Sequence, residues 1–426
     1  MMKRTNNVFI YTISCLRRRI DAKRISQYFL KNNFQIVDSP KEADYIVLFT
    51  CGFHDQVIHR CLDAIKHFQQ YDAELIIAGC LPAIAKEKVE RIFNGTVIPT
   101  DDLDKIDEKF HHNSIKLTAI PSAFSAWDNK TLLHVTDIKK SSVKTSRVEK
   151  NLREKIYLPL ANSILSKIPG INQIYAETIF EKKYYAGYTL LIGRGCVHNC
   201  SYCSIKKAIG PLKSKPIGLC LEEFKKGLKE GHTQFVLEAD DVGVYGLDRG
   251  YNIIALLNKM TSIKGDYFLR LGVTHPTFLI KHIEEIEKIL TRKKIRSIVL
   301  SIQSGSDRIL NLMHRSYTRQ DVEMLITKLK TADPNLELGT QFIVGFPTES
   351  WQDFNQTYQL LKTMNFDYGG VFKYSDVEGT ESYIMEPKIP EKEKTKRMNV
   401  TYDFLKKTHE YTWNTGRSIS FFNDKI

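Results

Sequence analysis

Three cysteines near the middle of the 426-residue chain have the spacing C-x3-C-x2-C. We call Cys196, Cys200 and Cys203 the loop cysteine set. Three thiolates on one short loop can bind three irons of a cubic [4Fe-4S] cluster and leave the fourth iron open to a small molecule. Zinc is the alternative metal, but a structural zinc site needs four ligands, and His198 reaches awkwardly from between two cysteines. We therefore predict an iron–sulfur cluster at this loop.

Three further cysteines each follow a predicted strand in the N-terminal region. Cys15, Cys51 and Cys80, which we call the N-terminal cysteine set, come after strands expected at residues 8–13, 45–49 and 74–78. Parallel strands bring their carboxyl ends to one edge of a sheet, where such folds place ligands. The three thiols are therefore expected to meet and hold a second cluster with an open iron. The alternative for a single cysteine is a packed core thiol, which is our interpretation of Cys61 and Cys220.

The elements that position these cysteines alternate between strand and helix periods, so the predicted fold class is α/β. Expected helices at 21–33 and 55–68 separate the first strands, which implies an N-terminal parallel sheet covered by helices. From residue 188 onward, six strand–helix units predict a partial (β/α)6 barrel, whose chemistry gathers at the carboxyl ends of its strands. The expected barrel strands are 189–193, 234–237, 266–271, 296–303, 336–345 and 367–374.

We divide the chain into four parts on this pattern. They are an N-terminal domain over 1–130, an enlarged linker over 131–185, a partial barrel over 186–390, and a C-terminal helix and tail over 391–426. The linker is long for a connection inside a compact fold.

The composition is that of an ordinary globular protein, with 42% apolar and 26% charged residues, which excludes a disordered chain. Eight cysteines are too few for a disulfide scaffold. The net charge of +13 favours nucleic acid, anionic lipid or an acidic peptide as a partner, or else is a solvated basic surface. No apolar run approaches the ~18 residues of a membrane helix. We therefore expect a cytoplasmic protein without membrane contact.

The loop cysteine set, with Tyr202 directly before its third cysteine, resembles the motif of radical S-adenosylmethionine (SAM) enzymes. Two three-cysteine sites in this order resemble the methylthiotransferase family of that superfamily, over nearly the whole chain. The other matching segments are Thr50-Cys51-Gly52-Phe53, Gly79-Cys80-Leu81-Pro82, Tyr245-Gly246-Leu247-Asp248, Arg270 with Thr274-His275-Pro276, and residues 303–310 and 342–347. The resemblance implies two [4Fe-4S] clusters and two roles for SAM, as radical source at the loop set and as methyl donor to sulfur at the N-terminal set. The implied reaction converts an unactivated C–H bond into C–SCH3.

Candidate cofactor-binding residues beyond the cysteines are polar, and most fall near predicted strand ends inside the barrel. They are Tyr202, Glu238, Asp240, Arg270, Gln303 and Gln341. We expect Tyr202 to contact adenine and the others to contact ribose, the methionine carboxylate or substrate, with a buried structural role as the alternative. Asp240 and Gln341 stand where the family favours glutamine and aspartate. Arg17, Arg18 and Arg19 beside Cys15 either balance cluster charge, grip an acidic substrate or form a solvated basic run.

The expected substrate rests on a departure from the family. Members that modify transfer RNA or the ribosomal protein carry a C-terminal TRAM-type β-barrel that contacts substrate, and only fourteen residues follow the helix predicted here at 391–412. We therefore expect a variant without that barrel, acting on a peptide or protein such as a ribosomally made precursor peptide. Transfer RNA, favoured by the +13 charge, is the weaker alternative.

Other partners and alternatives complete the prediction. The resemblance implies a sulfur source and an external electron donor such as flavodoxin or ferredoxin. Two other functions remain open. The protein could be a two-cluster radical enzyme that performs different carbon–sulfur chemistry, or a two-cluster electron carrier.

Overall fold

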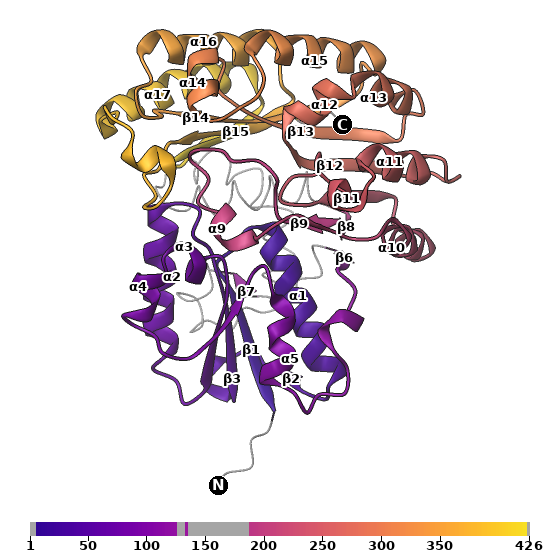
Figure 1. Ribbon diagram of the computed structural model, residues 1–426, viewed down its shortest axis with the longest axis vertical. Coiled ribbons are helices and arrows are strands. Elements are labelled where there is room, and N and C mark those ends of the chain that lie inside the picture. The colour runs from indigo at the N-terminus through magenta and orange to yellow at the C-terminus, as the bar shows by residue number, and fades with distance from the viewer. Residues whose placement is uncertain (1–5, 126–132, 135–186, 424–426) are drawn as a thin grey trace, which may run out of the picture.

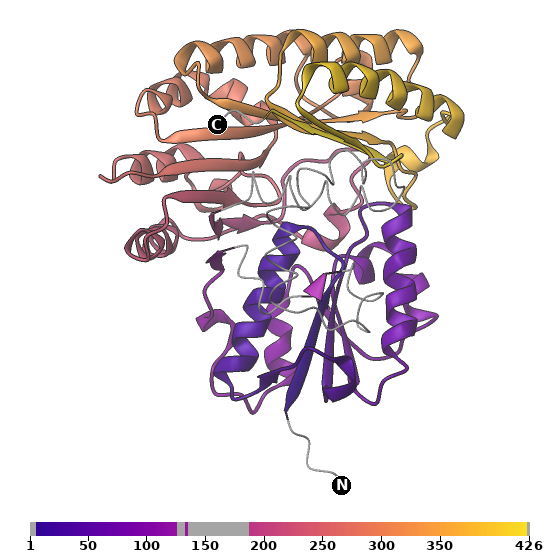
Figure 2. The ribbon, with the colours of Figure 1, turned by 180° about the vertical axis from the view of Figure 1, so that it is seen from behind.

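The computed structural model describes residues 6–125, 133–134 and 187–423. Figures 1 and 2 show two α/β parts, with the N-terminal part below and a larger sheet covered by helices above. The strands of the lower part run up toward the upper part, so their carboxyl ends lie at the contact between the two (Figure 1). The predicted fold class, with two α/β parts in this order, is confirmed.

The N-terminal sheet is parallel and has the strand order β2-β1-β3-β4-β5. Its strands are β1 (Asn7–Thr12), β2 (Gln35–Ile36), β3 (Tyr45–Thr50), β4 (Glu74–Gly79) and β5 (Thr96–Pro99). A short strand β7 (Leu133–His134) pairs with β1. All six residues of β3 are buried, as the run of β-branched and aromatic residues requires for a central parallel strand.

Helices cover both faces of that sheet. They are α1 (Leu16–Lys31), α2 (Asp55–Phe68), α3 (Leu81–Ile84), α4 (Lys86–Glu90) and α5 (Ile106–Lys109). The helix α2 has the expected bounds, but α1 starts at Leu16 rather than at residue 21. The early start brings three consecutive arginines into the first turn directly after Cys15, a position that apolar periodicity did not indicate.

The second sheet contains six parallel strands in chain order, which is the expected partial (β/α)6 arrangement. They are β8 (Tyr188–Leu191), β11 (Gln234–Glu238), β12 (Phe268–Thr274), β13 (Ile295–Gln303), β14 (Glu337–Val344) and β15 (Tyr368–Lys373). The antiparallel strand β6 (Ala123–Ser125) extends the sheet beside β8. A small antiparallel ribbon, β9 (Gly193–Arg194) and β10 (Lys213–Ser214), flanks the loop cysteine set.

Helices of the second part pack on the outer face of its sheet. They are α10 (Ile217–Lys229), α11 (Ile253–Thr261), α12 (Pro276–Lys281), α13 (Ile283–Leu290), α14 (Asp307–Leu312), α15 (Arg319–Ala332), α16 (Trp351–Thr363) and α17 (Glu391–Thr408). The short helix α9 (Lys206–Ile209) instead lies at the contact between the two parts, where it packs on α3 (Figure 1). Two helices, α12 and α13, rather than one connect β12 to β13.

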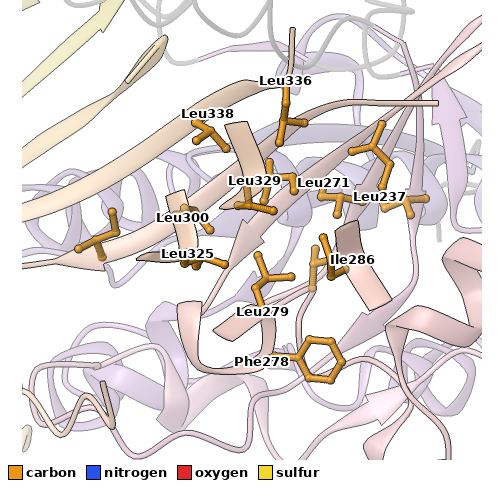
Figure 3. Close-up of a cluster of buried hydrophobic side chains, with 14 of the residues drawn as sticks. Leu237, Leu271, Phe278, Leu279, Ile286, Leu300, Leu325, Leu329, Leu336 and Leu338 are labelled. Atoms are coloured by element: carbon orange, nitrogen blue, oxygen red, sulfur yellow. The ribbon is translucent and has the colours of Figure 1, made fainter. Parts of the chain in front are cut away.

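Alternate residues of the barrel strands form the core between sheet and helices. Figure 3 shows Leu271, Leu300 and Leu338 from three adjacent strands near Leu325 and Ile286 of the covering helices. Burial of one such leucine contributes roughly 1.5–3 kcal/mol. Because side chains alternate along a strand, the residues between these leucines face the opposite, inner side of the sheet.

The C-terminal segment differs from the expected helix and tail. After α17, strands β16 (Tyr411–Asn414) and β17 (Ser418–Phe422) form a hairpin, and β17 pairs antiparallel with β15. Of the expected linker, only Leu133 and His134 belong to the described residues; the rest of 131–185 lies outside them. Among the described residues, no helix has the length and apolar character needed to cross a membrane.

Candidate active site

The N-terminal cysteine set lies at a single edge of the first sheet. Cys15 precedes α1, Cys51 directly follows β3, and Cys80 directly follows β4. The strands β1, β3 and β4 are parallel neighbours, so all three cysteines leave the sheet at its carboxyl edge. This placement is as expected, and their role as cluster ligands stays a prediction.

A glycine in the left-handed region precedes one cysteine of each set. Gly79 has φ of +98°, and a Cβ atom there would collide with the carbonyl oxygen of Thr50. Gly195 has φ of +78°, and a Cβ atom there would collide with the carbonyl oxygen of Pro211. Only glycine fits such turns without strain, so these residues set the directions in which Cys80 and Cys196 leave their strands.

The thiols of the N-terminal set are close enough to influence one another. Burial raises the pKa of Cys80 to about 11, and the nearby Arg18 guanidinium opposes this shift. Burial, Cys15 and Cys80 raise the pKa of Cys51 well above its ordinary value. Three mutually repelling thiolates in such a place need a cation, and iron supplies it. The donor set therefore fits a cluster.

Cys61 lies directly against Cys51 and is fully buried. The Cys51 amide donates to the Cys61 sulfur at 3.3 Å, and the Cys61 thiol donates to the Cys51 carbonyl at 3.4 Å. Burial raises the pKa of Cys61 to about 12, so it is a neutral thiol at physiological pH. It thus supports the backbone of a candidate ligand, in agreement with a packing role.

The loop cysteine set lies between the ribbon strand β9 and the helix α9, and β9 follows the first barrel strand, β8. The Cys203 amide donates to the carbonyl of Cys200 at 3.1 Å, and the His198 amide donates to the Cys196 sulfur at 3.4 Å. Burial raises the pKa of Cys196 to about 12, with Asp241 adding to the shift. As at the first set, thiolates here need a metal partner, and three of them fit a cluster with one open iron.

Arg315 is a contact to this loop that the sequence pattern did not reveal. Its side chain is 6% exposed, and its guanidinium donates to the Cys200 sulfur at 3.5 Å. A second nitrogen of Arg315 donates to the carbonyl of Ser301 on β13. The two contacts hold one positive charge beside the loop cysteine set.

His198 and His275 stack beside Cys196, with ring centroids 3.8 Å apart. The Asp241 carboxylate orients both residues, because it bonds to His198 Nε2 at 2.9 Å and accepts from the His275 amide at 3.1 Å. Ligand atoms of Cys196, His198 and Asp241 lie within 4.8 Å of one another. Burial, with Arg315 and His198 nearby, lowers the pKa of His275, so His275 is neutral.

Three other candidate residues lie at strand carboxyl ends, as expected. Glu238 ends β11, Asp240 follows it by two residues, and Gln303 ends β13. Burial raises the pKa of Glu238, and Arg17 opposes the shift. Gln303 is 8% exposed and has φ of +73°, a strained conformation that surrounding structure must hold in place.

The candidates Arg270 and Gln341 do not lie at the carboxyl ends of their strands. Arg270 is the third residue of β12, in a row with Ser297 and Glu337 near the amino ends of their strands. Its guanidinium pairs with the Glu337 carboxylate at 2.9 Å. The expected position at a strand end was wrong because β12 runs on to Thr274. Gln341 lies in the middle of β14.

Tyr202 packs on a small apolar cluster. It contacts a group that contains Met313, Phe346 and Tyr374. Burial raises the pKa of Tyr202 well above its ordinary value, so its hydroxyl stays protonated. The adenine contact expected for it stays a prediction.

The two cysteine sets meet at the contact between the two parts of the molecule. Ser204, directly after Cys203, donates to the carbonyl of Gly52, directly after Cys51, at 3.3 Å. Arg17, two residues after Cys15, lies 3.5 Å from the Glu238 carboxylate. The contact between the two parts therefore brings the neighbours of both cysteine sets together.

Comparison with protein families and proteins agrees with this arrangement. Residues 190–361 match the Radical SAM superfamily, and residues 7–98 match the Uncharacterized protein family UPF0004. The chain is 27% identical, over 98% of its length and 84% of the relative's, to a probable threonylcarbamoyladenosine tRNA methylthiotransferase of Methanocaldococcus jannaschii. It is 28% identical, over 92% of its length and 81% of the relative's, to the ribosomal protein uS12 methylthiotransferase RimO of Thermodesulfovibrio yellowstonii.

Among solved structures, the fold is similar to that of the radical S-adenosylmethionine methyltransferase TsrM from Kitasatospora setae. That structure, with cobalamin and a [4Fe-4S] cluster bound, has a TM-score of 0.56 and 12% identity, over 87% of this chain and 75% of the other. At this identity the similarity concerns the fold alone.

Proposed function

The chain belongs to the radical SAM methylthiotransferase family, and we propose that its substrate is transfer RNA, at an adenosine that already carries a threonylcarbamoyl group. The enzyme uses two [4Fe-4S] clusters and SAM. The reaction would replace one hydrogen on carbon by a methylthio group. The observation that carries the substrate proposal is the relative from M. jannaschii, which is named for this substrate and aligns with 98% of the chain.

The cysteine sets divide the work in this proposal. Cys196, Cys200 and Cys203 would hold a cluster that supplies the electron for cleavage of SAM, and Cys15, Cys51 and Cys80 would hold a second cluster with an open iron for the sulfur. The chain itself brings the two sets to facing edges. Its contact between Ser204 and Gly52 joins the residues that follow Cys203 and Cys51, which supports a single reaction space.

The net charge of +13 is consistent with an RNA substrate, because lysine and arginine neutralise phosphates. The relatives reported above favour this alternative over the precursor peptide expected from the sequence. The uS12 relative, at 28% identity, supports a second candidate, which is a ribosomal protein substrate.

The test uses anaerobically reconstituted enzyme with SAM, sulfide and a reductant. It is offered transfer RNA bearing threonylcarbamoyladenosine, the same RNA without that group, or a peptide from uS12. We expect a methylthio product by mass spectrometry only with the first substrate. Product with the peptide alone would overturn the RNA proposal.

Matched variants separate the roles of the two sets. Cys200→Ala should abolish formation of 5′-deoxyadenosine, while Cys51→Ala should keep that formation and lose the methylthio product. Cys220→Ala removes a buried cysteine that belongs to neither set. It should leave the yields of 5′-deoxyadenosine and of the methylthio product unchanged. Full product formation by Cys51→Ala would exclude the N-terminal set from sulfur transfer.

A further inference from the structure

The residues that flank the two cysteine sets are joined to each other through Asp240. One oxygen of its carboxylate lies 3.2 Å from Arg17 Nε and 3.7 Å from an Arg18 nitrogen. The other oxygen accepts from the Gly195 amide at 2.9 Å. Arg17 and Arg18 open α1 directly after Cys15, and Gly195 directly precedes Cys196. One carboxylate therefore contacts the neighbours of a cysteine from each set.

A second ion pair joins the same two segments. Arg194 lies in the ribbon strand before Cys196, and its guanidinium donates twice to the Asp21 carboxylate. Nη1 donates to Oδ2 at 2.8 Å, and Nη2 donates to Oδ1. Asp21 lies on α1, and its carboxylate also pairs with Arg18 at 3.2 Å. The first turns of α1 are thus tied to the approach of the loop cysteine set at two points.

These ion pairs are largely buried, and their burial indicates whether they stabilise the fold or position the groups that they join. The side chains of Arg18 and Asp21 are each 2% exposed, and that of Asp240 is 5% exposed. Buried ion pairs repay their desolvation poorly, so they are weak evidence for a stabilising role. Their geometry, however, is directional, and it fixes the position of the groups that they join.

We propose that Asp240, with Arg17 and Arg18, is a positioning residue that sets the spacing between the N-terminal and loop cysteine sets. The proposal rests on the proposed function, because transfer of sulfur to a substrate carbon requires both centres to reach the same atom. A misplacement of about 1 Å at such a site can cost about 100-fold in rate. The Asp240 contacts therefore couple the relative position of the two parts of the molecule to sulfur transfer.

The direct test measures the spacing itself. In reconstituted enzyme with both clusters reduced, magnetic dipolar coupling between them reports their separation and its spread. We expect Asp240→Asn to keep full iron content and to broaden the distribution of couplings, because asparagine can still accept from Gly195 but cannot pair with the arginines. Coupling identical to that of the wild type would overturn the proposal.

Arg17→Gln, and the double variant that combines it with Asp240→Asn, show whether Arg17 and Asp240 act together. Arg17 is partly exposed, with 22% of its side chain accessible, so its replacement is the milder change if Asp240→Asn does not fold. The double variant should broaden the coupling by less than the sum of the two single changes, and the remainder reflects the contact of Arg17 with Glu238; fully additive effects would contradict the pairing. As a control, Glu87→Gln removes an exposed pair with Arg91 on the surface of the N-terminal part and should leave the coupling unchanged.

Product analysis gives the second readout. The ratio of methylthio product to 5′-deoxyadenosine should fall by about 10- to 100-fold in Asp240→Asn, while an unchanged ratio would overturn the proposal. The dipolar measurement needs no substrate. If the wild-type enzyme modifies no transfer RNA, the substrate proposal fails, and the coupling still decides whether Asp240 sets the spacing.

Discussion

Arg315 places a buried positive charge and a hydrogen-bond donor at a cysteine of the loop set. Donation to a cluster sulfur favours the reduced, more negative state and raises the reduction potential. Arg315→Met keeps an unbranched side chain but removes the charge and the donor. We expect the cluster assigned to the loop cysteine set in the proposed function to become harder to reduce, measured as a lower midpoint potential in a redox titration followed by electron paramagnetic resonance.

His314 supplies the control for this prediction. It donates through Nδ1 to the carbonyl of Asn199 at 2.9 Å, so it contacts the same loop without reaching a sulfur. His314→Gln should leave the potential unchanged. Arg315→Lys keeps the charge and should lie between Arg315→Met and the wild type; equal potentials in all of them would show that Arg315 has no influence on the cluster.

At the scale of residues, sequence patterns predicted the placement of the cysteines but not their partners. Each cysteine of the N-terminal set follows a strand that local periodicity indicates, so topology alone brings the three together. The Arg315–Cys200 contact joins residues 115 positions apart, and Arg17 reaches Glu238 across 221 positions. No local pattern encodes such contacts, because they depend on how complete elements pack.

At the scale of elements, the C-terminal hairpin completes the second sheet. It covers the edge of β15, whose unpaired backbone groups would otherwise be a site for association with other chains. Ile419 and Phe421 on β17 are fully buried in the same core as the barrel leucines. The phenyl ring of Phe421 also packs on His409, with ring centroids 4.6 Å apart.

Phe421→Ala should therefore destabilise the barrel by about 3–5 kcal/mol, because it leaves a cavity in the core. The expected result is a lower midpoint of urea unfolding, followed by circular dichroism. Phe268→Ala, on strand β12 of the same sheet, is the control, since Phe268 is 38% exposed and should cost much less. Equal losses in both variants would mean that the hairpin is not part of the barrel core.

The elements that sequence patterns missed share a physical cause. The buried barrel strands and amphipathic helices have clear periods, and their bounds agree to within a few residues. The strands β16 and β17 are short and edge-like, so their pattern is weak, and they are held by pairing with β15. The first turn of α1 was missed because Arg17 and Arg18 contact acidic partners there and present no apolar face.

At the scale of the whole molecule, the two cysteine sets lie at the contact between the two α/β parts, and the excess positive charge bears on the choice of partner. The +13 charge by itself suits either RNA or an acidic protein. The two partners differ in how binding depends on salt, because only a polyphosphate backbone releases a dense layer of condensed counterions when lysines and arginines replace it.

Binding of transfer RNA should therefore weaken steeply with salt. For about six phosphate contacts or more, the affinity should fall by roughly 10³-fold or more between ~50 and ~200 mM salt. The measurement is a series of binding titrations with reconstituted enzyme, using transfer RNA and a uS12 peptide side by side. Neutralising one lysine that contacts RNA should reduce the slope of log K against log salt by about one unit. A shallow slope for RNA, with tighter binding of the peptide, would favour the ribosomal protein instead.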